Sequence, residues 1–383
     1  MHPGLKWGSC ALTAMVAMAS AGATTEVSEE RVAEYVRNFP YQDTYDYAMK
    51  YTGGDPARFN VWVLGAEPVL VKAGDDKVVR MNNDTFYKMA FVSLAKGPVV
   101  LSSTDSAADR FSSFQLMDDR NVNYANVIRP NGEYTLYSGE RPATIRGEAI
   151  EVPSELSVVI VRVEVKDKLA PADVTAAEAI FRGIAIDGPS IDRVPAVDRL
   201  SGFDAAVAKE ALRRIDQTFQ KGPFRSLVAG PGEVPDKVSH LQLAAGTKGG
   251  WGGPVVMHSS YETLFLGADG KRFDGSLGAY TVTTPEPPVD AFWSITVYDS
   301  ERGGFLHPND DDRYHINNTS AVKNDDGSVT FLFQRHCGPG DSNCLEVPNG
   351  EFDLTARYYL PQGPIQTGEW QLPPIQRVRG VAP

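Results

Sequence analysis

The chain has 383 residues, of which 42% are hydrophobic and 22% are charged, and its formal net charge is −12. This composition excludes a disordered or collagen-like chain, and the acidic balance disfavours a surface that binds nucleic acid or an anionic membrane. At roughly 100–200 residues per domain, the length predicts two or three domains.

Residues 1–23 have the features of a secretory signal peptide. Lys6 gives a basic start, residues 7–19 are mostly apolar or small, and Ala21-Gly22-Ala23 suits a cleavage site. A buried N-terminal helix is the alternative, but polar residues follow the short apolar stretch at once. We therefore expect a periplasmic or secreted protein that does not insert into a membrane after cleavage.

Cleavage would remove Cys10 and leave Cys337 and Cys344 in a loop rich in Gly, Pro, Asp and Asn. Two neighbouring cysteines in an exported chain predict a disulfide. Closing so short a loop adds only about 2.5 kcal/mol of stability by chain entropy, so the bond would clip a loop without holding the fold. Metal binding by these cysteines is disfavoured, since no CxxC pair accompanies them.

Residues 24–60 are predicted to be helical. Val32, Tyr35 and Val36 recur at helical spacing after Ser28, which suits an N-cap. The helical pattern resumes over residues 45–51, and Gly53-Gly54 ends it.

Residues 61–168 change to the short alternating runs that are typical of a β-sandwich. Turn signals separate the runs, and the last one is rich in β-branched residues, as a central strand is. The predicted strands are residues 61–64, 78–81, 86–94, 99–101, 111–117, 122–127, 134–137 and 158–165.

Residues 169–254 are predicted to be a helical connector, with helices over residues 174–184 and 203–219. The glycine-rich stretch 246–254 resembles a phosphate cradle only superficially, and we expect a flexible connector there. Residues 255–383 form a second β block, with a turn at residues 324–327. Its best predicted strands are residues 261–266, 279–283, 291–299, 329–335 and 352–360.

Common catalytic motifs are absent from the sequence. It contains no HExxH motif, GxSxG elbow, Walker loop or Rossmann glycine fingerprint. His307 and His315 flank three aspartates, where a surface turn is favoured over a metal site. The cofactor, if there is one, stays unknown.

Two polar turns in the first block are candidates for chemistry. Asn83, Asp84 and Tyr87 belong to the densest polar cluster there, which suits either ligand contacts or an Asx turn that caps its own backbone. Asp118 and its neighbours suit acid–base work or a hairpin turn.

Arginines and tyrosines on apolar strands form a second group of candidates. Arg162 lies on a different face from Val159, Val161 and Val163, where it would make an internal salt bridge or bind an anion.

In the second block, alternation places Arg357 and Tyr359 on one face of their strand and Tyr298 on one face of another. If these faces adjoin, they line a cup for a small polar or acidic ligand; a solvated outer face is the alternative. His258 is a weaker acid–base candidate.

Several segments resemble a bacterial exported family. Residues 79–87 and 111–118 are similar to its N-terminal module, and residues 287–299 and 352–359, with Trp370, to its C-terminal module. These modules are the paired domains of unknown function twelve-fifty-four and twelve-fourteen. The resemblance implies an immunoglobulin-like β-sandwich, a helical connector and a jelly-roll-like β-sandwich, and it implies no activity. The cysteine loop departs from the family pattern as a local elaboration.

The leading hypothesis is an exported two-lobed β protein that binds a small polar or anionic ligand between its lobes. The expected contacts are Asn83, Asp84, Tyr87, Arg162, Tyr298 and Arg357.

Two alternatives stay open. One is a periplasmic hydrolase or lyase, with Asp84 or Asp118 as general base and Tyr87 or His258 as its proton partner. The other is a structural or interaction module without a small-molecule site. Whether the chain is an enzyme, and whether it forms an oligomer, the sequence leaves undecided.

Overall fold

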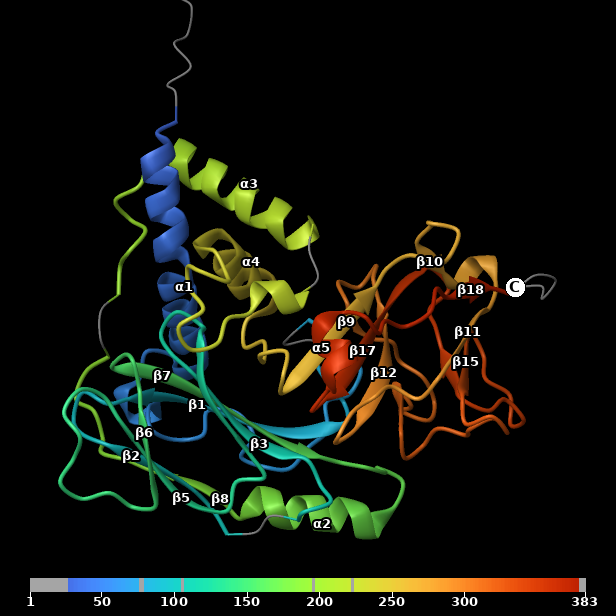
Figure 1. The fold of residues 1–383 in the computed structure, drawn as a ribbon, viewed down its shortest axis with the longest axis horizontal. Coiled ribbons are helices and arrows are strands. Elements are labelled where there is room, and N and C mark those ends of the chain that lie inside the picture. Colours follow the sequence, from blue (N-terminus) through green and yellow to red (C-terminus); the bar gives the residue numbers. More distant parts are fainter. Residues whose placement is uncertain (1–26, 76–78, 105–106, 195–196, 222–223, 379–383) are drawn as a thin grey trace, which may run out of the picture.

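The first lobe of the computed structural model is a sandwich of two four-stranded sheets (Figure 1). One sheet has the order β1-β7-β3-β4 and the other β6-β5-β2-β8, and every pairing is antiparallel except β5 with β6. The strands are β1 (Thr85–Ser93), β2 (Val99–Ser103), β3 (Ser112–Met117), β4 (Asn123–Ile128), β5 (Gly132–Tyr137), β6 (Glu148–Glu151), β7 (Leu156–Glu164) and β8 (Ile184–Asp187).

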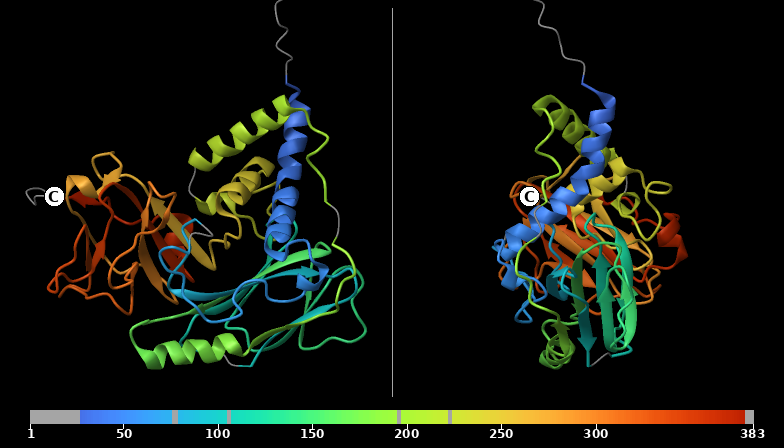
Figure 2. Two further views of the ribbon diagram at one scale, coloured as in Figure 1. Left: turned by 180° about the vertical axis from the view of Figure 1, so that it is seen from behind. Right: turned by 90° about the vertical axis from the view of Figure 1, so that its left-hand side faces the viewer.

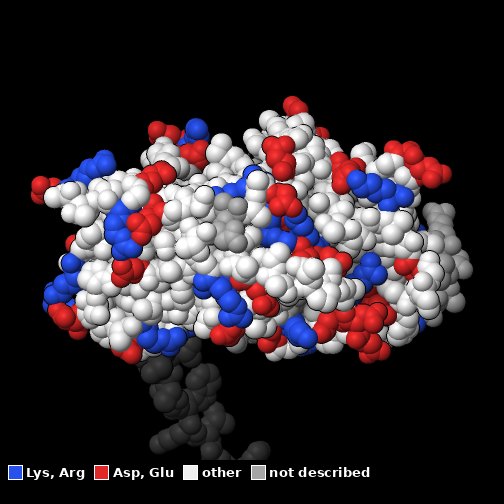
Figure 3. Space-filling model, turned by 90° about the horizontal axis from the view of Figure 1, so that it is seen from below, with Lys and Arg blue, Asp and Glu red and all other residues white. Residues whose placement is uncertain are grey.

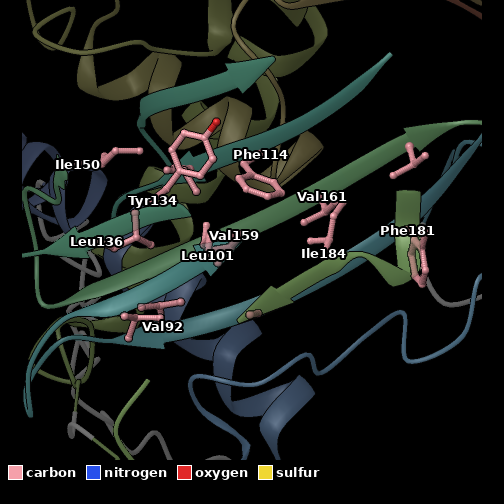
Figure 4. Packing of buried hydrophobic residues seen from close by; sticks show 14 of the residues in the cluster. Val92, Leu101, Phe114, Tyr134, Leu136, Ile150, Val159, Val161, Phe181 and Ile184 are labelled. Carbon is pink, nitrogen blue, oxygen red and sulfur yellow. The ribbon is translucent and has the colours of Figure 1, made fainter. Parts of the chain in front are cut away.

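The core of this lobe lies between the two sheets (Figure 4). Val159 and Val161 of β7 point into it beside Phe114, whereas Leu101 and Leu136 enter from the opposite sheet. Val159, Val161 and Val163 can fill this core because the odd-numbered positions of β7 share one face of the strand, as the alternation predicts.

The second lobe also has two sheets. The larger has the order β10-β17-β12-β13, with β9 added to β17 and β14 to β12; the smaller has the order β16-β15-β11-β18. The strands are β9 (Ser259–Leu264), β10 (Phe273–Asp274), β11 (Tyr280–Thr284), β12 (Trp293–Asp299), β13 (Phe305–Leu306), β14 (His315–Asn317), β15 (Val329–Gln334), β16 (Cys344–Glu346), β17 (Glu351–Tyr359) and β18 (Gln376–Arg377).

Three long helices pack together above the first lobe (Figures 1 and 2). Ser28 caps the first of them and Gly53, at a φ of 67°, ends it, as the sequence predicts. A fourth helix, α2, lies against the first lobe. The helices are α1 (Glu29–Thr52), α2 (Pro171–Arg182), α3 (Ala205–Lys221), α4 (His240–Gly250) and α5 (Gly363–Thr367), with short 3-10 turns η1 (Pro56–Arg58), η2 (Phe224–Leu227) and η3 (Gly275–Leu277).

The structure describes residues 27–75, 79–104, 107–194, 197–221 and 224–378. The predicted signal peptide and Val78, the first residue of a predicted strand, lie outside these ranges. Within them the fold is mainly β with a helical insert, which confirms the predicted class and is consistent with two β-sandwich domains. No helix of the described chain combines the length and the apolar character that a membrane crossing requires.

The prediction of a flexible connector over residues 246–254 is wrong, because its first half is helical. Gly246, Gly249 and Gly250 all belong to α4. A Cβ at Gly246 would stand 2.1 Å from the carbonyl oxygen of Leu227, and a Cβ at Gly249 would stand 2.2 Å from the ring of Phe219. These glycines therefore allow the helix to pack closely against its neighbours. From composition alone, the same glycines indicate a flexible connector.

Two predicted strands of the first lobe do not form. Residues 61–64 make only an isolated bridge, between Leu64 and Met89. Gly65 then turns the chain at a φ of 79°, so close to the carbonyl of Tyr87 that no side chain fits. Residues 79–81 leave the first lobe and run onto the second, where Arg80 adopts a positive φ of 52°.

Residues 79–84, which we call the crossover segment, join the two lobes just before β1. The backbone nitrogen of Arg80 donates to the carbonyl of Gly304 at 2.9 Å, and the hydroxyl of Tyr298 donates to the carbonyl of Met81 at 2.7 Å. The Asn82 amide donates to the hydroxyl of Tyr359. The crossover segment thus lies against the polar face of the larger sheet of the second lobe.

The predicted disulfide is present. Cys337 and Cys344 are bonded, with their Cα atoms 5.8 Å apart, and they close the loop between β15 and β16.

Candidate functional site

The polar face of the second lobe is built by the pairing of β12 with β17. Ser294 lies opposite Arg357 and Tyr298 lies opposite Asp353 in the register. Trp293, Ile295 and Val297, which alternate with them on β12, belong to the core of the lobe. The polar faces of β12 and β17 therefore adjoin, a point that the sequence left open. The solvated-face alternative is wrong for these residues, since Arg357 is 2% exposed and Tyr298 is fully buried.

Arg357 sits at the centre of this face. Its Nη1 donates to the hydroxyl of Thr296 at 3.0 Å, and its Nη2 donates to the Tyr298 hydroxyl and to the Arg80 carbonyl, each at 2.7 Å. The guanidinium also lies 5.4 Å from the centre of the Tyr261 ring. Its Nε has no hydrogen-bond partner among the described residues.

Arg162 approaches the same region from the first lobe. It pairs with Tyr87 in the register of β7 with β1, and its guanidinium lies 5.3 Å from the centre of that ring. Its Nη1 donates to the side-chain oxygen of Gln115, while its Nε, like that of Arg357, has no partner in the described structure. The internal salt bridge considered for Arg162 does not form with any described carboxylate.

Asp84 lies between the lobes at the end of the crossover segment and is 1% exposed. Neither carboxylate oxygen makes a regular hydrogen bond within the described ranges, and the Oγ of Ser294 beside it is also unpartnered. Burial raises the pKa of Asp84, although the nearby charge of Arg357 and the polar groups of Ser294 and Asn82 oppose the shift.

Tyrosines enclose these three charged groups. Tyr359 stacks on Phe292 with ring centres 4.0 Å apart and lies 6.4 Å from Tyr261. Burial raises the pKa of Tyr298 to about 12 and also raises that of Tyr261, so their hydroxyls stay protonated at neutral pH. We call the whole group the junction cluster: Asp84, Tyr87, Arg162, Tyr261, Ser294, Tyr298, Arg357 and Tyr359.

Sequence reasoning did not find Tyr261. It lies on β9 directly opposite Arg357 in the β9–β17 register. Alternation along β9 places Tyr261 and Thr263 on one face, and this was the available signal.

Three other predicted site residues lie outside the junction cluster. Asn83 contacts the Nδ1 of His315 at 3.2 Å and the carbonyl of Val71, so it fastens the crossover segment. Asp118 caps its own hairpin turn and pairs with Arg120 at 2.9 Å. His258 precedes β9, and its carbonyl accepts from Leu360.

Glu164 is a further titratable group near Asp84. One of its oxygens accepts from the backbone nitrogen of Phe111 at 2.8 Å. Burial raises the pKa of Glu164 to about 7, and the neighbouring Asp84 adds to the shift. With Glu164 protonated, Arg162, Arg357 and Asp84 leave a net positive charge between the lobes.

Two hollows on the described surface lie elsewhere. One, of about 150 Å³, includes Tyr41, Asp119 and Arg199; the other, of about 390 Å³, includes Thr281 and Asn343. No residue of the junction cluster lines either. Among the described residues no group of three or more His, Cys, Asp or Glu side chains is placed to hold a metal ion, so His307 and His315 do not form such a site.

Comparison with protein-family models matches both lobes. Residues 63–188 match DUF1254 and residues 258–363 match DUF1214, each described as a protein of unknown function. Curated proteins give no significant match.

Comparison with solved structures also finds likenesses. The VPA0106 protein from Vibrio parahaemolyticus is 20% identical at a TM-score of 0.75, with 91% of this chain and 99% of that chain covered. An uncharacterised protein from Burkholderia cenocepacia is 14% identical at a TM-score of 0.43, with 88% and 91% covered. The first likeness shows a common fold. The chain thus carries paired domains of unknown function, DUF1254 followed by DUF1214, in the order that its motifs predict.

Proposed function

We propose that this protein binds a small anionic molecule at the junction of its two lobes. The observation that carries the proposal is the pair of buried guanidinium groups of Arg162 and Arg357. Each has an unpartnered Nε, and no described carboxylate lies within ion-pair distance of either. A buried cation with an unpartnered donor and no ion pair is costly, and a ligand anion that completes its contacts would remove that cost.

The other groups of the junction cluster favour a small organic anion such as a carboxylate. A guanidinium donates hydrogen bonds in a plane that matches a carboxylate, and tyrosine hydroxyls add further donors. Large stretches of the surface mix Lys and Arg with Asp and Glu, as Figure 3 shows for one face. The positive charge between the lobes is therefore local, which suits a small ligand better than a polyanion.

Entry to the site would occur past Tyr87 and Tyr261, the partly exposed members of the cluster, since Asp84, Arg162 and Arg357 are buried. A movement of these rings, or of the lobes, would admit the ligand, and closure would exclude water and strengthen its contacts with the arginines. The signal-like residues 1–23 support a periplasmic or secreted location for this binding.

A second candidate function is that of a hydrolase or lyase acting on the bound anion. Asp84 favours it, because a buried carboxylate with two unpartnered oxygens and a raised pKa suits a general base or acid. The hydroxyls of Tyr298 and Tyr359 also lie near it, and the charge of Asp84 helps to raise the pKa values of both tyrosines. Turnover of a bound acid would distinguish this function from binding alone.

The experiment is calorimetric titration of the purified full chain with succinate, citrate and acetate at constant ionic strength, with succinamide as the uncharged control. We expect a carboxylate to bind and succinamide not to bind. A ligand at 100 times its Kd adds about 2.7 kcal/mol of stability, which a thermal shift also detects.

Arg162→Gln should weaken this binding at least tenfold. The matched control is Lys88→Met, which also removes a buried cation. Lys88 lies on β1, next to β7, but it points to the opposite side of the sheet from Arg162, where its Nζ lies 4.2 Å from the centre of the Phe181 ring. Equal affinity for succinate and succinamide in the wild type, or equal losses in the two variants, would contradict the proposal.

A further inference from the structure

The unpartnered polar atoms of the junction cluster are of two opposite kinds. The Nε–H groups of Arg162 and Arg357 are donors, and they require an acceptor. The two oxygens of Asp84 are acceptors when ionised, and they require a donor. A simple carboxylate satisfies the first requirement and brings no donor to Asp84.

From this we infer that the ligand is a small hydroxy acid, whose carboxylate meets the two arginines and whose hydroxyl donates to Asp84. The inference rests on the proposed function and narrows it. A hydrogen bond from a neutral hydroxyl to a buried carboxylate is charge-assisted, and it replaces the hydration that Asp84 loses on burial. The Oγ of Ser294, which is also unpartnered and fully buried, gives the hydroxyl oxygen a donor in return.

The net charge of the junction cluster favours a hydroxy acid over an amino acid as the ligand. Arg80 is already paired with Asp353 at 2.8 Å, and His315 at the edge of the site is neutral because burial lowers its pKa to about 3. With Glu164 protonated and Asp84 ionised, as the hydrogen bond from the ligand hydroxyl requires, the two arginines and Asp84 sum to one positive charge. A hydroxy acid monoanion neutralises this charge, whereas a zwitterionic amino acid leaves it in place.

The test is a comparison of matched acids by calorimetric titration at pH 6.0. Lactate against propionate and glycolate against acetate differ only by the hydroxyl, and alanine replaces the hydroxyl of lactate by an ammonium. We expect each hydroxy acid to bind at least tenfold more tightly than its deoxy partner and lactate to bind more tightly than alanine.

Asp84→Ala should remove the preference for the hydroxyl while propionate still binds, because both arginines remain. Asp84→Asn is the second variant, in case the truncation does not fold, and it should reduce the preference to within about threefold because it keeps a neutral acceptor. Asp118→Asn is the matched control at a buried carboxylate outside the site, and it should keep the full preference.

The outcomes separate the two proposals. If propionate and lactate bind equally to the wild type, the inference is overturned and anion binding stands. If alanine binds more tightly than lactate, the charge argument is wrong and the inference falls. If no acid binds, the proposed function itself fails and the inference fails with it. A preference that survives in Asp84→Ala would assign the hydroxyl to another group and also overturn the inference.

Discussion

Arg80 and Arg357 fasten the crossover segment to β17 across the lobe junction. The Nη2 of Arg357 donates to the backbone carbonyl of Arg80 at 2.7 Å, while the side chain of Arg80 binds both oxygens of Asp353, on the same strand as Arg357. One residue of the crossover segment thus satisfies a cation and an anion of β17, and this fixes the segment that carries Asp84.

Arg80→Met is expected to destabilise the protein by about 3 kcal/mol, because it leaves the fully buried Asp353 with Ser300 as its remaining side-chain partner. The free energy of unfolding in urea measures the effect. Asp353→Asn in the same chain should recover part of the loss, since the amide carries no charge.

The matched control is Arg272→Met. Arg272 pairs with Glu351, also on β17, but both side chains are more than 40% exposed, so we expect a loss of at most about 1 kcal/mol. Equal losses in the two methionine variants would mean that the Arg80 pair is no better shielded from water than the surface pair.

The contribution of Glu164 to stability should fall between pH 5 and pH 8. Burial raises the pKa of Glu164 to about 7, above its ordinary value of 4.5, so the folded chain holds this proton over a range where the unfolded chain has released it. The stabilisation is complete below pH 4.5 and is lost as the pH rises through 7, a change of up to about 3 kcal/mol.

Glu164→Gln should flatten this slope, because glutamine keeps an acceptor for the backbone nitrogen of Phe111 and does not titrate. Urea midpoints at pH 5, 6, 7 and 8 provide the measurement, with Glu148→Gln as an exposed control. A remaining slope belongs to Asp43 and Asp119, whose pKa values burial raises to about 7 and about 6. An unchanged slope in Glu164→Gln would show that this proton is not held by Glu164.

Gly246→Ala and Gly249→Ala should have different effects although both lie in α4. Alanine favours a helix by up to about 1 kcal/mol over glycine. At position 246 the new methyl group would meet the backbone of Leu227, which cannot yield, so we expect a net loss of about 2 kcal/mol. At position 249 it would meet the ring of Phe219, which is 38% exposed and free to turn away.

We therefore expect Gly249→Ala to leave the thermal midpoint unchanged or to raise it. Circular dichroism melts of the two variants and the wild type measure the difference. Equal midpoints for the two variants would mean that the backbone of Leu227 moves aside as readily as the ring does.

Loss of the disulfide should have a small effect. Replacing Cys337 and Cys344 by serine removes a constraint on a short loop, which by chain entropy costs about 2.5 kcal/mol at most. Urea unfolding measures the loss, and carboxylate binding should be unchanged because the loop lies away from the junction cluster. Failure of the serine variant to fold would show that the bond does more than clip its loop.

The strands of both lobes could be predicted largely from alternation. The faces of Arg162 and of Arg357 could be predicted in the same way, since period-two spacing alone fixes which side chains of a strand point together. What faces them could not, because alternation contains no information about which sheet lies opposite. The contact of Arg357 with Arg80 joins residues 277 positions apart.

Two further features were out of reach for physical reasons. The helix α4 contains glycines because Leu227 and Phe219 pack too closely against it for a side chain to fit, and composition alone does not reveal this packing. The path of residues 79–81 away from the first sheet depends on the positive φ of Arg80 and on contacts with Gly304, which exist only once the second lobe is in place.

The crossover segment also bears on how the protein would behave if it were divided. A fragment starting near residue 255 would expose the hydroxyls of Tyr298 and Tyr359 and the guanidinium of Arg357 to solvent, since their partners Met81, Asn82 and Arg80 come from the other half of the chain. The two halves therefore cannot be exchanged independently. A chimera that takes its second lobe from a relative must also take the crossover segment from that relative, because this segment contacts β12 and β17.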